Sequence, residues 1–245
     1  MELVASKTKA LDLLAVGDSH IRPLTMLPSE QVRAVPISGA TMSGALNPAS
    51  KTQARSTILS TVEEHSTAQC VFLALGEVDA GFLAPMKSGP ANIDEAMESL
   101  DRGIDRYMTL VAEVGERAAE AKLIVGGVMP WAVPDWALRV SKIPLRRQVK
   151  LSQTARMSLI DHVNDALQVA VPKIGATFCR FDTAFDETRR NLRPNHMNPR
   201  DHHCSSWFYL NVLTRSLSDL DLGIEFQLPS RARCRRKDMR SFVRG

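Results

Sequence analysis

Short apolar runs alternate along this chain with longer stretches of mixed apolar and charged residues. Five of the runs are six or seven residues long and are bounded by glycine, proline or charged residues. A strand that is covered on both faces, as in a parallel sheet, reads as a nearly continuous apolar run of this length. We therefore predict five strands, over residues 11–16, 32–37, 70–75, 122–128 and 176–181.

The stretches between these runs place apolar residues at spacings of three and four. In residues 93–118, for example, Leu100, Ile104 and Val111 fall on one helical stripe. Strands that alternate with helices predict right-handed crossovers and a three-layer α/β/α sandwich. Residues 131–147, which contain two prolines and two tryptophans, are expected to form an insertion or lid. The predicted helices cover residues 52–62, 93–118, 151–171 and 205–217.

Basic residues gather at the C-terminus. The net charge is +4, but residues 231–245 hold seven Lys or Arg and one Asp, whereas the first 230 residues hold 24 basic and 26 acidic residues. We expect a single domain over residues 1–228 and a basic, flexible tail over residues 229–245. Such a tail could bind nucleic acid or another anionic surface. Because no aromatic stacking platform accompanies it, a solvated terminus without a nucleic-acid partner is the favoured interpretation.

The compartment follows from the cysteines and from the lack of long apolar segments. The chain's four cysteines are scattered without paired spacing, which favours a reducing compartment over a disulfide framework. No apolar run approaches the roughly 18–20 residues of a membrane span, and the first residues lack the pattern of a secretory signal. We therefore expect a cytoplasmic protein with no membrane partner.

Glycines and polar residues follow three of the predicted strands directly. The segments 17–20, 38–41 and 76–79 come after the first, second and third strands, and residues 201–203 precede the last predicted helix. In open parallel sheets, ligands bind beyond the carboxyl ends of the strands. We therefore expect these four segments to meet at one rim and to form a site.

The residue types at this rim fit nucleophilic acyl transfer. A serine hydroxyl becomes a nucleophile when a histidine takes its proton and an acidic residue orients that histidine. Ser19 lies on a predicted strand-to-helix turn, where it could supply both the nucleophile and one backbone N–H for the oxyanion, and Gly39 could supply a second N–H. Other interpretations stay open: Ser19 could cap the following helix, and Glu77 and Asp79 could cap a segment or pair with an arginine.

Two of the segments resemble the first two sequence blocks of the SGNH/GDSL hydrolases. Gly-Asp-Ser-His at residues 17–20 is similar to the first block, which makes Ser19 the nucleophile. Ile-Ser-Gly-Ala-Thr at residues 37–41 is similar to the second, which makes Gly39 an oxyanion donor beside the Ser19 amide. The resemblance extends in block order to about residue 217. It implies a flavodoxin-like fold, an esterase, lipase or carbohydrate-deacetylase activity, and no cofactor.

The two later segments resemble the remaining blocks with departures. Gly-Glu-Val-Asp at residues 76–79 is similar to the Gly-x-Asn-Asp block, but Val78 stands where the family uses an asparagine as an oxyanion donor. The same four residues of this chain are similar to a Gly-Glu-Ile-Asp form, which resembles the variant of this block in a bacterial branch of SGNH-like proteins. Those proteins are often linked to polysaccharide genes. Asp201 and His203 resemble the last block, as orienting acid and base, with one residue between them instead of two. His202 is the reserve base.

We therefore expect a serine esterase of the SGNH type that acts on a small-molecule or carbohydrate ester. The alternative, favoured by Val78 and the short acid–base spacing, is a catalytically weakened domain that binds a glycan or a protein. Trp131 is expected to stack on a sugar ring or cover an acyl chain, or else to anchor a lid. The residues expected to contact substrate are Asp18, His20, Glu77, Asp79, Trp131 and His202.

A zinc site is the remaining hypothesis for the histidines near residue 200. Imidazoles and a thiolate suit zinc, but structural zinc sites place their ligands in paired spacings that are missing here. We therefore expect no metal. The residues concerned are His196, His202, His203 and Cys204.

Overall fold

A five-stranded parallel sheet forms the centre of this protein, in the order β2-β1-β3-β4-β5. The structure is a computed structural model that describes residues 11–88, 92–129, 133–139, 144–181 and 205–240. All five predicted strands are confirmed, with ends that differ by a few residues. The strands are β1 (Leu13–Gly17), β2 (Val32–Pro36), β3 (Cys70–Ala74), β4 (Lys122–Gly126) and β5 (Thr177–Cys179).

The four predicted helices are also confirmed, and several short helical turns accompany them. The long helices are α1 (Ala54–Glu64), α3 (Ile93–Arg117), α5 (Gln153–Ala170) and α6 (Ser206–Ser218). The others are α2 (Ala84–Lys87), α4 (Asp135–Arg139), α7 (Arg231–Arg240), the 3₁₀ turns η1 (Ser19–Met26), η3 (Pro144–Gln148) and η4 (Val171–Ile174), and the π-helical turn η2 (Asp79–Leu83).

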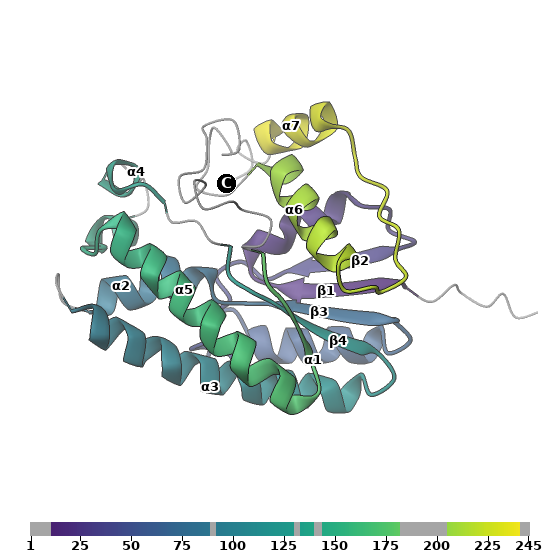
Figure 1. The fold of residues 1–245 in the computed structure, drawn as a ribbon, viewed down its shortest axis with the longest axis horizontal. Coiled ribbons are helices and arrows are strands. Elements are labelled where there is room, and N and C mark those ends of the chain that lie inside the picture. The colour runs from purple at the N-terminus through teal and green to yellow at the C-terminus, as the bar shows by residue number, and fades with distance from the viewer. Residues whose placement is uncertain (1–10, 89–91, 130–132, 140–143, 182–204, 241–245) are drawn as a thin grey trace, which may run out of the picture.

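Helices cover both faces of the sheet, which confirms the predicted three layers. Helices α1, α3 and α5 lie on one face, and η1, α6 and α7 lie on the other (Figure 1). Successive residues of a strand point to opposite faces. Leu14 and Val16 of β1 accordingly enter the core beneath α1, α3 and α5, whereas Leu13 and Ala15 enter the core beneath η1 and α6.

The C-terminal segment differs from the flexible tail that the charge pattern predicts. Residues 231–240 form α7, which contacts α6. Cys234 and Asp238 lie one helical turn apart and are both buried. The Asp238 carboxylate accepts hydrogen bonds from the amide and the hydroxyl of Ser206, in the first turn of α6. This contact satisfies an amide that has no partner within its own helix, and it ties the basic segment to the domain.

Residues 131–147, expected to be an insertion or lid, contain α4 and η3. Arg156 of α5 is fully buried and donates hydrogen bonds to the Asp135 carboxylate, at 2.6 Å, and to the Leu151 carbonyl. Because a buried guanidinium needs an acidic partner, this ion pair holds α4 against α5. Trp136 on α4 is 62% exposed.

Two further observations concern the membrane and thiol predictions. No helix in the described parts of the chain has the length and apolar character to cross a membrane. Cys70, Cys179 and Cys234 are buried and carry free thiols. Burial raises the pKa of all three thiols, which disfavours the reactive thiolate. Cys204 lies outside the described residues.

Candidate active site

The carboxyl ends of β1, β2 and β3 meet where the strand order reverses, at the point where open α/β sheets bind ligands. The Ile37 amide donates to the Gly17 carbonyl at 2.7 Å, and the Asp18 amide donates to the Ala74 carbonyl at 3.0 Å. A Cβ atom on Gly17 would lie 2.2 Å from the Ala74 oxygen, so only glycine permits this approach. The three predicted segments after these strands are thus brought together.

Ser19 is the first residue of η1, directly after the end of β1. Asp18 precedes the first helical residue, and its carboxylate accepts a hydrogen bond from the His20 amide at 2.9 Å. This is the geometry of an N-cap, and it satisfies one of the amides that a helix start leaves without a partner. The capping role considered for Ser19 therefore belongs to Asp18, and Ser19 occupies the strand-to-helix turn that the sequence predicts for a nucleophile.

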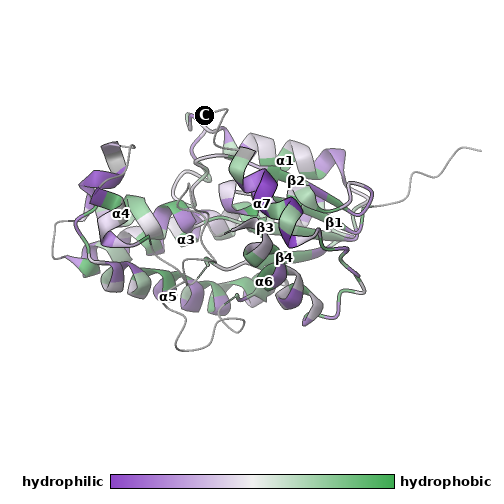
Figure 2. Ribbon diagram, turned by 90° about the horizontal axis from the view of Figure 1, so that it is seen from above, coloured by the Kyte–Doolittle hydropathy of each residue, from purple (hydrophilic) through white to green (hydrophobic). Residues whose placement is uncertain are grey.

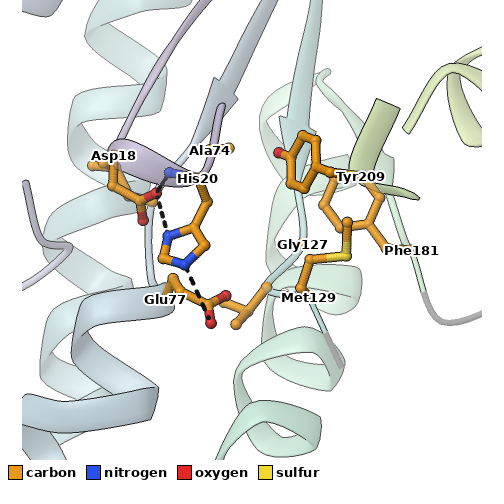
Figure 3. Close-up of a pocket in the computed structure, with 10 residues that line it drawn as sticks. Asp18, His20, Ala74, Glu77, Gly127, Met129, Phe181 and Tyr209 are labelled. Atoms are coloured by element: carbon orange, nitrogen blue, oxygen red, sulfur yellow. Dashed lines mark hydrogen bonds and ion pairs between the residues drawn. The ribbon is translucent and has the colours of Figure 1, made fainter. Parts of the chain in front are cut away.

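His20 lies between two buried carboxylates (Figure 3). Its Nδ1 is 3.1 Å from Asp18 Oδ1, and its Nε2 is 3.7 Å from Glu77 Oε1. Burial is the main cause that raises the pKa of Glu77, to about 7; His20 and the Met129 amide oppose the shift, and the Asp18 charge reinforces it. His20 and Glu77 were expected to contact substrate. Their pairing with each other was not predicted.

Gly39 lies on the turn that follows β2. The Ala40 amide donates to the Ile37 carbonyl at 3.1 Å, and Gly39 within this turn has a φ of +77°, which favours glycine. Both Ser38 and Gly39 are exposed. Within the described parts of the chain, the Gly39 amide has no hydrogen-bond acceptor. Its N–H is therefore available to a ligand at this rim.

Asp79 supports the same loop from the β3 side. Its carboxylate accepts hydrogen bonds from the Met42 amide at 2.7 Å and the Ser43 amide at 3.2 Å, and the residue is only 3% exposed. Asp79 was expected to contact substrate. The structure instead buries it against two backbone amides, so it acts by fixing the loop that carries Gly39.

Asn164 holds the end of β4 and was not predicted as a site residue. Its Oδ1 accepts from the Val128 amide at 2.8 Å, and its Nδ2 donates to the Val128 carbonyl at 2.9 Å. Because Asn164 is buried, these bonds replace the sheet partners that Val128 would otherwise need. A single asparagine within an apolar helical stripe was the signal that the sequence offered.

A small cavity adjoins His20 and Glu77 on the side of the Met129, Phe181 and Tyr209 side chains (Figure 3). The space open to water is about 10 Å³, which is room for roughly one water molecule. This cavity is too small for an ester substrate. The cavity is thus lined by two buried carboxylates, Asp18 and Glu77, with the half-buried His20 between them.

Several predicted residues lie outside the described parts of the chain. The described residues contain no group of three or more His, Cys, Asp or Glu side chains arranged to hold a metal ion. The candidate acid, the candidate bases, the tryptophan expected at the substrate and the histidine and cysteine of the zinc hypothesis are all outside. These are Asp201, His202, His203, Trp131, His196 and Cys204.

Solved lipases share this fold at low sequence identity. An extracellular lipase from Streptomyces rimosus matches with a TM-score of 0.57 and 18% identity over 84% of this chain and 100% of its own. A phospholipase A1 from Streptomyces albidoflavus matches at 0.51 and 15%, over 86% of this chain and 99% of its own. A GDSL-like lipase from Bacteroides thetaiotaomicron matches at 0.51 and 16%, over 90% and 93%.

No protein-family model matches the sequence, and no curated protein matches it significantly. The structural likeness confirms the predicted architecture, a five-stranded parallel sheet between helical layers with the fold of SGNH/GDSL hydrolases.

Proposed function

We propose that this protein is a serine ester hydrolase of the SGNH type, with Ser19 as its nucleophile. The observation that carries the proposal is the placement of Ser19. It begins η1 at the carboxyl end of β1, and the Gly39 turn follows the neighbouring strand β2. Three solved lipases share this fold, which agrees with an esterase but does not by itself assign the reaction.

In the proposed first half-reaction, Ser19 Oγ forms a bond to the ester carbonyl carbon and its proton passes to His203. Asp201 orients the imidazole and stabilises its positive charge. The carbonyl oxygen becomes an oxyanion, which the Ser19 and Gly39 amides receive as hydrogen-bond donors. The bond to the alcohol then breaks, and the alcohol leaves with the proton held by His203.

In the second half-reaction, a water molecule attacks the acyl group on Ser19 while His203 takes the water's proton. A second oxyanion forms at the same donors. The bond to Ser19 breaks, the carboxylic acid leaves, and His203 returns the proton to the serine oxygen. The proposed substrate is the ester of an acylated carbohydrate, on which Trp131 would stack.

Hydrolysis of p-nitrophenyl acetate by the Ser19→Ala variant between pH 5 and pH 9 tests the proposal. The wild-type rate is expected to rise through a histidine pKa of about 6.5, and the variant is expected to lose roughly 10³-fold or more of it. Ser60→Ala is the matched control, because Ser60 is exposed on α1 and its hydroxyl donates to the Thr57 carbonyl of the same helix. An unchanged rate in Ser19→Ala would overturn the proposal.

A second candidate function rests on Val78. This half-buried residue cannot donate a hydrogen bond where SGNH hydrolases resembling this chain use an asparagine, and the loss of one oxyanion donor typically costs about 10²–10³ in turnover. The alternative is therefore a weakened domain that binds a glycan or a protein. In that case, Ser19 would not react with a fluorophosphonate, and Ser19→Ala would keep its affinity for the ligand.

A further inference from the structure

Helix α7 presents a strongly basic surface to solvent. Five of its first seven residues are Arg or Lys, and these charged residues colour the helix purple in Figure 2. Arg233, Arg235 and Arg236 are exposed, while Cys234 and Asp238 face inward. No carboxylate in the described parts of the chain forms an ion pair with the three exposed arginines.

The basic surface continues from α7 to the candidate active site. Lys237 Nζ donates to Thr25 Oγ1 at 2.7 Å, and Thr25 belongs to η1, the turn that begins at Ser19. Arg22 on η1 is exposed and donates to Ser38 Oγ at 3.0 Å, next to Gly39. A line of cations therefore runs from α7 along η1 to the proposed oxyanion turn.

The cations on this line are close enough to repel one another. The pKa of Lys237 is lowered by burial, and then by the charges of Arg233 and Arg22, while the Asp238 carboxylate opposes the shift. Like charges held close together oppose folding, and the one acidic residue of α7, Asp238, is buried against Ser206. Here the buried contacts of Cys234 and Asp238 keep α7 in place in spite of that repulsion. An anionic ligand would relieve it.

We propose that α7 and Arg22 form a cationic track that binds an anionic carbohydrate chain carrying the ester hydrolysed at Ser19. The inference rests on the proposed function and names its substrate class. Arginine predominates on the track, and its planar fork matches carboxylate and phosphate groups, with two parallel hydrogen bonds to each.

Two other anionic partners, a membrane surface and a nucleic acid, fit the surface of α7 less well. A helix that docks on a membrane needs an apolar face, and Met239 is the one large apolar side chain exposed on the described residues of α7. A nucleic acid supplies phosphates but contains no carboxylic ester for Ser19 to attack. An acylated carbohydrate with carboxylate or phosphate groups supplies both the charge and the ester.

Binding of polygalacturonate to the full chain tests the track. The measurement uses a Ser19→Ala background, so that hydrolysis plays no part. Arg235→Gln/Arg236→Gln is expected to bind roughly tenfold more weakly at 50 mM salt, and to lower the slope of log K against log salt concentration by roughly two, about one per lost contact. Thermal melting within a few degrees of the parent shows that the variant is folded.

Arg102→Gln/Lys173→Gln is the matched control, since it removes two exposed cations, one on α3 and one on η4, and is expected to bind as the parent does. Equal losses of polygalacturonate affinity in the two double variants would overturn the track. The track would also be overturned if the parent bound neutral dextran as tightly as it binds polygalacturonate.

Two further probes distinguish the source of the negative charge. Binding to single-stranded DNA or to phosphatidylglycerol vesicles at least tenfold tighter than to polygalacturonate would overturn the carbohydrate assignment in favour of that partner. The binding result is separate from the esterase assay. If the chain binds polygalacturonate through α7 but Ser19 is unreactive, the cationic track stands and the proposed esterase reaction fails. If Ser19 is reactive but α7 does not bind polygalacturonate, the esterase stands and the track fails.

Discussion

Replacing Glu77 with glutamine is expected to change how folding stability depends on pH. In the folded chain Glu77 faces Asp18 at the end of β1, His20 on η1 and the Met129 amide beyond β4, and burial raises its pKa from 4.5 to about 7. Between these two values, the folded chain holds a proton that the unfolded chain has released. The contribution of Glu77 to the stability of the wild type therefore falls as the pH rises from 4.5 to about 7 and then levels off.

The size of the effect follows from the two pKa values. A difference between 4.5 and about 7 corresponds to roughly 3 kcal/mol of stability that the Glu77 ionisation costs the wild type across that interval. Glutamine has the shape of the protonated acid and does not ionise. Glu77→Gln should therefore match the wild type near pH 4 and exceed its unfolding free energy by up to about 3 kcal/mol at pH 8.

Urea unfolding followed by far-ultraviolet circular dichroism at pH 4, 5, 6, 7 and 8 measures this difference. Glu98→Gln is the control, because Glu98 lies on α3 with a side chain 73% exposed and is expected to change stability by less than about 1 kcal/mol at every pH. A difference between Glu77→Gln and wild type that stays constant with pH, or a variant less stable than the wild type at pH 8, would refute the reasoning.

Three smaller changes test the supports of the site. Gly39→Ala should lower the unfolding free energy by about 1 kcal/mol, because Gly39 has a φ of +77° and a Cβ atom there meets nothing closer than 3.7 Å; a fully wild-type urea midpoint would contradict the strain. Asn164→Ala leaves the buried amide and carbonyl of Val128 without their side-chain partners and should cost about 2–4 kcal/mol in the same assay. A loss below about 1 kcal/mol would mean that Val128 finds other partners. Asp238→Asn removes the charge that receives the Ser206 amide and should destabilise the chain by about 1–2 kcal/mol, with hydrogen exchange increasing first in α7; uniform exchange across the sheet would argue against a local role.

The strands and long helices could be predicted because each is encoded in a local pattern. The ends of β4 and β5 could not, since they depend on contacts between distant residues. The apolar run that begins at Lys122 continues to Val128, but β4 stops at Gly126 because Asn164 of α5 takes both backbone groups of Val128. β5 is shortened to Thr177–Cys179, paired with β4 as far as Gly126.

The site was predictable as a set of strand ends but not as a set of contacts. Strand ends placed Ser19, Gly39 and Glu77 at one rim because parallel strands share a direction. That His20 would turn toward Glu77, 57 residues further along the chain, depends on side-chain packing that no local pattern encodes. The charge count at the C-terminus predicted a flexible tail and did not take account of Cys234 and Asp238. Their spacing of four residues places both side chains on the buried face of α7.

Labelling with a fluorophosphonate, read by intact mass and peptide mapping, tests the central claim most directly. The account predicts a single adduct on Ser19 of the folded chain, and it predicts that His203→Ala abolishes the labelling because the hydroxyl then loses its base. No adduct on the wild type, or an adduct on a serine other than Ser19, would contradict the account.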